Sequence, residues 1–280
     1  FGYHYDRYHI ESSQYNATNW RDDASTTTLR NAFEGDTRTD ALFVQDVWSF
    51  APRWSATFGV RQERWQALDG TRASDTPFNP PVGAPVTFYA YADRSENFTS
   101  PKASLAWQAT PDWQLRASLA RAYRMPTASE LFQTETRGAG GTFISDPDLD
   151  PEKIRAADLS AVGYAWGGNV RFSLFDTRTD DALYSQLDVP SNVTRVENIG
   201  RTRVTGLEAV YDAQNWLVNG LDLSTSVTWA DSEILDNPGA PATVGKEVPR
   251  IPAWRANVFA AYRFDEHWSG SVGVRHSSAQ

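Results

Sequence analysis

The chain has 280 residues, which is enough for one large domain or two domains of ordinary size. It contains no cysteine, which excludes disulfides and thiolate chemistry, and its formal net charge of -9 argues against general nucleic-acid binding. No apolar run approaches the roughly 20 residues of a membrane helix, whereas the strands of a membrane barrel leave only a short, alternating signal.

Alternation of apolar and polar residues between turn signals predicts eleven β-strands. Compact domains rarely contain several loops above about 15 residues, but outer-membrane barrels do, because short turns lie on one side of the membrane and long loops on the other. The predicted strands lie near residues 1–11, 37–50, 53–67, 97–109, 113–124, 154–166, 169–186, 194–212, 221–231, 254–264 and 268–277. Short or medium connections are expected at 51–52, 110–112, 167–168, 187–193, 213–220 and 265–267, and long ones at 12–36, 70–96, 125–153 and 232–253.

The hairpin from Pro101 to Pro126 separates two kinds of side chain on its two faces. Side chains alternate across a strand, so the apolar set and the polar set fall on opposite sides. A charged face opposite an aromatic-capped apolar face is typical of a sheet with water on one side and lipid on the other. The apolar face comprises Ala103, Leu105, Trp107, Trp113, Leu115, Ala117 and Leu119, and the polar face Lys102, Ser104, Gln114, Arg116 and Ser118.

The strand before Trp48 fits this pattern less well. Placing Trp48, Val44 and Leu42 toward lipid also places Asp46 there. A bulge, or a position at the level of the lipid headgroups, would each resolve the conflict, and the sequence does not choose between them.

Aromatic residues six positions apart flank three of the short turns. An even spacing keeps both rings on one face when neither strand is bulged, so these pairs predict one ring of an interfacial aromatic girdle. The alternative is that the rings cover the ends of a soluble sandwich or propeller, which does not explain the long loops. The pairs are Trp48 with Trp54, Trp107 with Trp113, and Tyr262 with Trp268.

Five segments resemble, in order along the chain, motifs of the barrel of TonB-dependent outer-membrane receptors. Together they cover essentially the whole sequence. They are Ser-Pro-Lys-Ala-Ser-Leu-Ala-Trp at 100–107, Arg-Ala-Tyr-Arg-Met-Pro within 119–132, Asp-Pro-Asp-Leu-Asp-Pro-Glu-Lys at 146–153, the Asn-Ile-Gly and Gly-Leu-Glu strand at 197–208, and Gly-Lys-Glu-Val-Pro-Arg-Ile-Pro at 245–252. The motif positions with an expected structural role are Pro126, Pro151, Glu152, Asn198, Gly200, Gly206, Glu208 and Pro252.

The resemblance implies an all-β fold, namely a transmembrane antiparallel β-barrel segment with about 11 strands of a 22-stranded barrel. Residues 1–280 are expected to be one partial barrel domain, without the plug domain and the C-terminal strands. An odd number of strands agrees with a segment, because single-chain bacterial barrels usually have an even number.

The resemblance also implies an active-transport receptor in the Gram-negative outer membrane, with no enzymatic activity and no cofactor. The expected cargo is a scarce ligand, most often a ferric siderophore in this family, moved with energy from TonB, ExbB and ExbD. Outer-membrane lipid and the receptor's own plug domain are the other expected partners, and nucleic acid is not. By resemblance, haem receptors carry a histidine where this chain has none, between Pro126 and Asp146, which disfavours haem.

Three other functions stay open at this point. The ligand could be cobalamin, a sugar or a metal chelate, the barrel could be a passive porin or adhesin, or the chain could be a soluble all-β enzyme or binding domain. The sequence contains no nucleophile elbow, Walker loop or zincin motif. An upstream plug sequence would favour the receptor over the porin, and detergent-free solubility would refute the barrel.

Charged and aromatic side chains near the long loops are candidates for ligand binding. Arginines that rise along a strand toward the lumen mouth suit an anionic ligand, and aromatic rings beside arginine suit a planar one. The alternatives are that the charged residues pair across strands or brace the plug, and that the tyrosines form an upper girdle. The candidates are Arg61, Glu63, Tyr89, Tyr91, Arg94, Arg121, Arg124 and Arg137, with Arg116 below Arg121 on the same strand.

Asp146, Asp148 and Asp150 recur at every second position and offer the oxygen ligands that Ca²⁺ uses. Pro147 and Pro151 interleave them, however, and the glycine of a calcium loop is missing. We expect a rigid entry into the next strand here and no metal site.

Overall fold

The computed structural model describes residues 1–74, 87–136 and 142–279. Eleven long strands follow one another through a single sheet, each antiparallel to its neighbours, which confirms the predicted fold class. The strands are β1 (Gly2–Ala17), β2 (Thr26–Ala51), β3 (Trp54–Ser74), β5 (Arg94–Gln108), β6 (Trp113–Arg124), β9 (Glu152–Ala165), β10 (Gly168–Asp188), β11 (Val193–Ala213), β12 (Leu221–Asp236), β13 (Trp254–Arg263) and β14 (Ser269–Ser277).

Shorter elements lie at one end of this sheet. Strand β4 (Thr87–Ala90) pairs with β3, while β7 (Thr134–Thr136) pairs with β8 (Thr142–Ile144), which in turn lies parallel to β11. Helix α1 (Ala128–Phe132) follows β6, and two 3-10 turns (Asp23–Ser25 and Pro241–Thr243) lie in loops. None of the described helices is long and apolar enough to cross a membrane.

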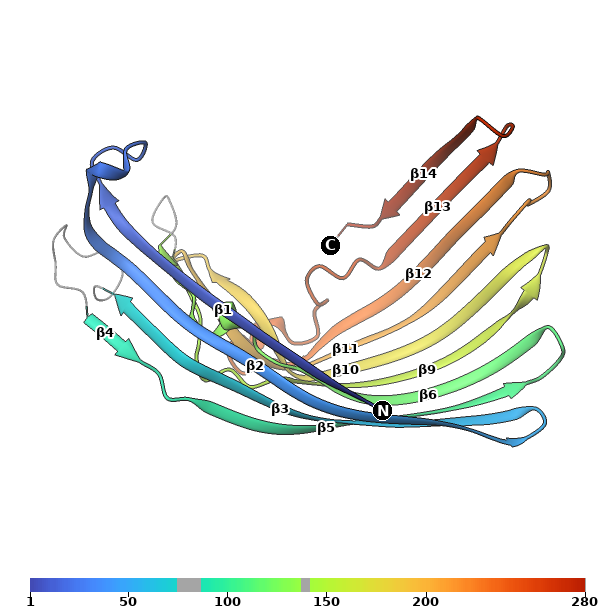
Figure 1. Ribbon diagram of the computed structural model, residues 1–280, viewed down its shortest axis with the longest axis horizontal. Coiled ribbons are helices and arrows are strands. Elements are labelled where there is room, and N and C mark those ends of the chain that lie inside the picture. Colours follow the sequence, from blue (N-terminus) through green and yellow to red (C-terminus); the bar gives the residue numbers. More distant parts are fainter. Residues whose placement is uncertain (75–86, 137–141, 280) are drawn as a thin grey trace.

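The sheet is strongly curved, and its strands run side by side like part of a tilted cylinder wall (Figure 1). Strands β1 and β14 each pair on one side only within the described residues. Short connections gather at the right-hand end of Figure 1, and the segments that join β1 to β2 and β6 to β9 lie at the other end.

One expected long loop proves to be mostly strand. The sequence predicted a connection over residues 12–36, but β1 and β2 stay paired as far as Ala17 and Thr26. Polar residues such as Ser12, Ser13 and Gln14 succeed one another there, so alternation disappears although backbone pairing continues. A strand whose two faces both meet water no longer carries the period-two signal.

Adjacent positions in the sheet form two rows of opposite character. Register places one row of apolar side chains on the outer, convex face and, at the adjacent position of each strand, a polar row on the inner face. The apolar row is Leu115, Ala161, Phe172, Ala209 and Val227. The polar row is Arg116, Ser160, Ser173, Glu208, Thr228 and Arg255. These rows show that the two faces suit two different solvents.

Asp46 lies on the apolar face without any bulge before it. The register between β2 and β3 is continuous from Asp36 to Ser49, so Asp46 shares its side with Val44 and Trp48. The irregularity comes later, between Ser49 and Ala51. The bulge explanation for Asp46 is therefore wrong, and its side chain stands exposed beside exposed apolar residues.

The aromatic pairs lie at the short-turn end of the sheet. Trp54 and Trp107 face each other across β3 and β5, with stacked rings whose centroids are 5.5 Å apart. The ring of Trp113 covers Gly163, where an added Cβ would collide with it. Tyr262 contacts Phe264 edge to face at 4.9 Å. Their membership of a membrane girdle stays a prediction.

Replacing Leu174 with arginine tests the assignment of the two faces. Leu174 is 50% exposed on the apolar side, and its neighbour Ser173 lies on the polar side opposite Glu208. A cation deep in the lipid-facing band costs about 2 kcal/mol or more. We expect Leu174→Arg to lower the unfolding free energy in vesicles by that amount, measured by urea titration of the protein that carries this chain. Ser173→Arg is the matched control, and equal losses for both variants would contradict the assignment.

Candidate functional site

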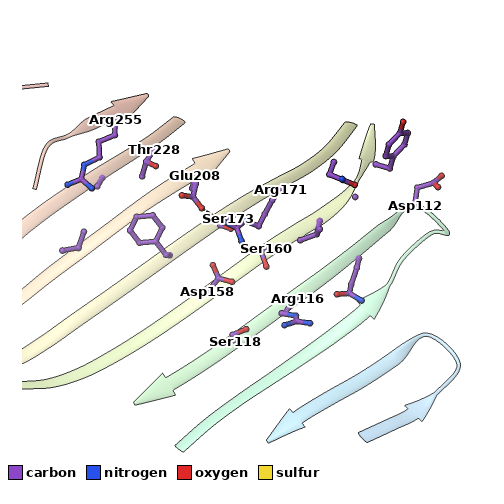
Figure 2. Close-up of a pocket in the computed structure, with 18 of the residues that line it drawn as sticks. Asp112, Arg116, Ser118, Asp158, Ser160, Arg171, Ser173, Glu208, Thr228 and Arg255 are labelled. Carbon is purple, nitrogen blue, oxygen red and sulfur yellow. Dashed lines mark hydrogen bonds and ion pairs between the residues drawn. The ribbon is translucent and has the colours of Figure 1, made fainter. Parts of the chain in front are cut away.

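The inner face of the sheet forms a broad polar hollow of 1230 Å³ between β6 and β13 (Figure 2). We call its lining the lumen wall. It presents hydroxyl groups beside carboxylates and guanidinium groups, so it offers hydrogen-bond donors and acceptors of both signs. Its labelled charged and hydroxyl members in Figure 2 are Asp112, Arg116, Ser118, Asp158, Ser160, Arg171, Ser173, Glu208, Thr228 and Arg255.

Charges on the lumen wall are only partly paired. The guanidinium of Arg171 lies 3.2 Å from the Glu208 carboxylate, and both side chains remain partly exposed. Exposed pairs of this kind contribute little to stability, about 0 to 1 kcal/mol. Arg116, Asp158 and Arg255 form no ion pair within the part of the chain that the structure describes. The wall is thus suited to contact a polar, hydrated partner.

Helix α1 lies against the inner face at the long-loop end. Pro126 precedes it, and Thr127 and Glu130 form a capping box in which Thr127 Oγ1 accepts from the Glu130 N–H at 3.2 Å. Glu130 Oε2 accepts from the Thr127 N–H at 2.8 Å. A capping box satisfies two unpaired amides at a helix start, which explains why so short a helix forms here.

The helix buries an apolar cluster on the inner face of the sheet. Trp65 and Leu131 are each only 1% exposed, and Phe132 and Leu149 complete the cluster's centre. Phe132 lies directly on Gly35 and Gly70, where an added Cβ would collide with the ring. These two glycines therefore permit the close approach of α1 to β2 and β3. We call this group the lumen cluster: Trp65, Ala67, Ala128, Leu131, Phe132, Leu149, Leu183 and Val196.

Arg124 ties the lumen cluster to the sheet. Its Nε donates to Glu152 Oε2 at 2.6 Å, and its Nη1 donates to Glu130 Oε1 at 3.1 Å. The other Glu152 oxygen accepts from the Leu183 N–H at 2.7 Å. One guanidinium thus joins β6, α1 and β9, and Glu152 extends the link to β10. Glu130 and Glu152, the two carboxylate partners of Arg124, are thus both engaged in contacts that hold the fold.

Arg94 anchors the segment that leads into β9. Its Nη1 donates to the carbonyl oxygens of Pro147 and Leu149 at 2.8 and 2.9 Å, and its Nη2 donates to Glu96 at 2.7 Å. The guanidinium also lies 5.4 Å from the centre of the Trp65 ring. Arg94, predicted from the sequence as a ligand contact, is therefore committed to holding this loop.

Asn198 holds the same segment from the other side. Its side chain accepts from the Asp150 N–H at 2.8 Å and donates to the carbonyl oxygens of Asp150 and Asp181 at 2.9 and 2.7 Å. Asp146 caps the turn by accepting from the Asp148 N–H at 2.9 Å. Over residues 1–74, 87–136 and 142–279, no group of three or more His, Asp or Glu side chains is arranged to hold a metal ion.

The remaining predicted ligand residues fall in different places. Arg61 and Glu63 form a pair at 2.7 Å on the inner face of β3, along one strand and not across neighbouring strands. Tyr91 stacks on Phe132 at 6.0 Å and belongs to the lumen cluster's edge. Tyr89 is 48% exposed on β4, opposite Arg72. Arg137 lies outside the described residues.

Arg121 lies on the opposite side from the one expected. The sequence argument grouped it with Arg116 and Arg124 on the lumen side, but an odd step along a strand changes face. Arg121 shares the outer face with Leu119, and it lines a groove there with Val60. The expectation that Arg121 faces the lumen is therefore wrong. It grouped the three arginines by their charge and ignored that odd and even positions of a strand face opposite sides.

Several motif residues serve close packing. Pro126, Pro151 and Pro252 are buried where strands begin or end. Gly206 lies under the Phe175 ring and against the Trp229 carbonyl, and an added Cβ would collide with both. Gly200 lies equally close to the Asp236 carboxylate. These contacts give a packing reason for the residue types at these positions.

Sequence reasoning missed three polar residues of the inner face. Alternation along the predicted strands would have found Asp158 and Arg171, just as it places Arg255 on the side opposite Trp254 and Ala256. Arg72 also lies on the inner face, opposite Phe33 and Tyr89, and its buried Nε has no partner among the described residues. It stands at the end of β3, where the sequence predicted a loop.

A curved antiparallel sheet with a lipid-suited outer face and a polar inner face defines the wall of a membrane β-barrel. Residues 1–280 match the family described as "TonB dependent receptor-like, beta-barrel". The chain belongs to this family. A search of curated proteins gives no match.

Solved structures of receptors share the fold. The ferric-catecholate import receptor Fiu from E. coli K12, in its closed form, has a TM-score of 0.71 and 15% identity, over 99% of this chain and 42% of its own. The siderophore receptor PiuA from Acinetobacter baumannii has a TM-score of 0.68 and 15% identity, over 98% and 42%. The hemophore receptor HasR from Serratia marcescens has a TM-score of 0.67 and 15% identity, over 99% and 50%.

The chain spans half or less of the length of each of these structures. At 15% identity, the likeness shows a common fold and does not transfer a ligand. The three receptors are described by a ferric catecholate, a siderophore, and a hemophore with heme, respectively. Cargo therefore has to be argued from this chain's own residues.

Truncating Leu131 tests whether the lumen cluster holds α1 in place. Removing a buried leucine costs about 2 to 5 kcal/mol, because both transfer energy and packing are lost. We expect Leu131→Ala to release α1 from the wall and to speed proteolytic cleavage within residues 125–151. Leu119→Ala removes the same atoms from an exposed position and serves as the control. Unchanged cleavage in Leu131→Ala would show that the cluster does not hold the helix.

Proposed function

We propose that this chain forms part of the barrel wall of a Gram-negative outer-membrane receptor that imports a scarce ligand, a ferric siderophore, with energy coupled through TonB. The proposal rests on one observation above all. Five strands in register carry a polar row on the inner face directly beside an apolar row on the outer face, and the polar row continues to β13. Such a wall separates lipid from a hydrated lumen.

The lumen wall suits a folded, polar occupant. Arg116, Asp158 and Arg255 offer charges that are free of ion pairs in the described part of the chain. In the proposed receptor these residues contact the plug domain, which closes the lumen until TonB rearranges it. The chain by itself would therefore line the path without moving ligand along it.

Ligand contact is proposed for the long-loop end. Tyr89 is exposed on β4, and Arg72 lies opposite it on β3, where its buried Nε has no partner among the described residues. An aromatic ring beside a guanidinium suits a planar, anionic chelate through stacking and charge. Arg94 and Arg124 support this mouth indirectly, because their donors hold the loop and α1.

The names of similar structures support iron chelates over other nutrients. Fiu is titled a ferric-catecholate import receptor, PiuA a siderophore receptor, and FyuA from Yersinia pestis a ferric yersiniabactin uptake receptor. HasR and the copper transporter OprC show that the same fold also serves other cargo. The ligand class is therefore the part of the proposal that most needs a direct test.

The decisive experiment uses the full-length protein that carries this chain. It should fractionate with the outer membrane, bind ferric siderophores from a panel, and support growth on the bound chelate only when TonB is present. Binding without any TonB requirement would indicate a passive porin. Binding of cobalamin or a sugar in place of every siderophore would overturn the iron assignment and leave the receptor class standing.

Substitution of Tyr89 tests the proposed ligand mouth. Aromatic contact with a cationic or planar group contributes about 0.5 to 2 kcal/mol, so Tyr89→Ala should raise the Kd for the ferric ligand about 2- to 30-fold. Phe88→Ala is the matched control, because Phe88 is the adjacent aromatic residue on the other face of β4. Fluorescence quenching of the purified receptor measures both. If only the Phe88 variant loses affinity, the mouth is misplaced.

A further inference from the structure

Four arginines lie directly opposite one another on four neighbouring strands. Arg121 of β6 is opposite Arg155 of β9, which is opposite Arg178 of β10. Arg178 is in turn opposite Arg203 of β11. Neighbouring strands lie about 4.8 Å apart, so the row crosses roughly 15 Å of surface. Like charges directly opposite each other destabilise a sheet, so this row calls for a counter-charge.

The arginine row lies on the outer face, just beyond the apolar band. Leu119 precedes Arg121 by two residues on the same face, and Leu174 precedes Arg178 by four. Both leucines are exposed on the side that we assign to lipid. The row is on the long-loop side of this band, at the level where hydrocarbon gives way to headgroups.

Protein carboxylates neutralise the row only in part. Asp176 accepts from Arg203 Nε at 2.6 Å and lies 3.3 Å from Arg178 Nε, while Asp180 pairs with Arg155. Arg121 has no carboxylate partner among the described residues. Its Nη2 donates to the Thr99 carbonyl at 3.0 Å, and its buried Nε has no partner there. Register also places Glu233 of β12 opposite Arg203 on the same face. Among the described residues, the shortage of negative charge is therefore at Arg121.

A groove of 810 Å³ joins this charge to an apolar floor. Arg121, Arg155 and Arg178 line one part of it with Asp176, and Val60, Ala103 and Leu119 line another with Asp46. A ligand that fills the groove therefore needs a negatively charged end and a hydrocarbon end. Guanidinium groups match phosphate in charge and in the geometry of their paired donors.

We propose that this groove binds a membrane lipid whose headgroup carries phosphate groups. An acyl chain lies on the floor around Leu119, and the phosphates bind Arg121, Arg155 and Arg178. The bound phosphates supply the counter-charge that Arg121 lacks among the described residues. Because the groove lies on the outer face, away from the lumen, this site is separate from the proposed uptake of ligand.

The test measures binding of lipid A, a lipid with two phosphate groups, to the full-length protein in neutral detergent. A basic residue near an anionic lipid surface contributes about a fivefold change in binding, so Arg121→Gln and Arg178→Gln should each weaken binding about fivefold. Arg38→Gln is the matched control, because Arg38 pairs with Asp40 at 2.7 Å outside the groove. Arg38→Gln should bind lipid A with unchanged affinity.

Two further measurements distinguish the proposal from a structural role and from another anion source. Without lipid, Arg121→Gln should melt at nearly the same temperature as the parent. No carboxylate loses its partner, and the lost Nη2 contact with the Thr99 carbonyl is offset by the loss of one like-charge contact. Arg121→Lys should retain most of the affinity. Wild-type lipid A affinity in Arg121→Gln, equal binding of inorganic phosphate alone, or equal binding of a dephosphorylated lipid A would each overturn the proposal. Siderophore uptake by these variants reports separately on the proposed function.

Discussion

The whole structure depends on one constraint, which is that backbone N–H and C=O groups in lipid must find partners within the protein. Within the described residues, eleven antiparallel strands satisfy these groups between neighbours, except along the outer edges of β1 and β14, and side chains can then alternate between two solvents. Register makes this alternation coherent across strands. The row through Leu115 and Phe172 faces lipid, while the row through Arg116 and Ser173 faces the lumen.

The same constraint explains where the fold departs from simple alternation. Above the apolar band both sides of the sheet meet polar surroundings, so the strands continue without a period-two pattern, as β1 does toward Ala17. Inside the lumen, a small apolar cluster forms where α1 meets Trp65 and the two glycines that admit Phe132. Charged residues such as Arg94 and Arg124 fasten this cluster instead of standing free for ligand.

The proposed receptor therefore has three kinds of surface, each suited to a different partner. The lumen wall offers mixed charges to a folded partner, and the mouth near Tyr89 and Arg72 offers an aromatic ring beside a cation. The outer face carries the arginine row at the edge of the lipid band. Family membership accounts for the barrel, but low identity to solved receptors leaves recognition to residues particular to this chain.

The sequence by itself determined the strands, their order and most of their faces, because strand periodicity is a local property. Alternation also places Arg121 on the same face as Leu119, but the prediction grouped Arg121 with the other arginines by charge and so assigned it to the wrong face. Only the tertiary structure decided which residues meet across strands. The position of α1 in the lumen, the Arg94 contacts with the 146–151 loop, and the four-arginine row all depend on contacts between distant segments. Register is set by the joint pairing of many strands, so no single segment contains it.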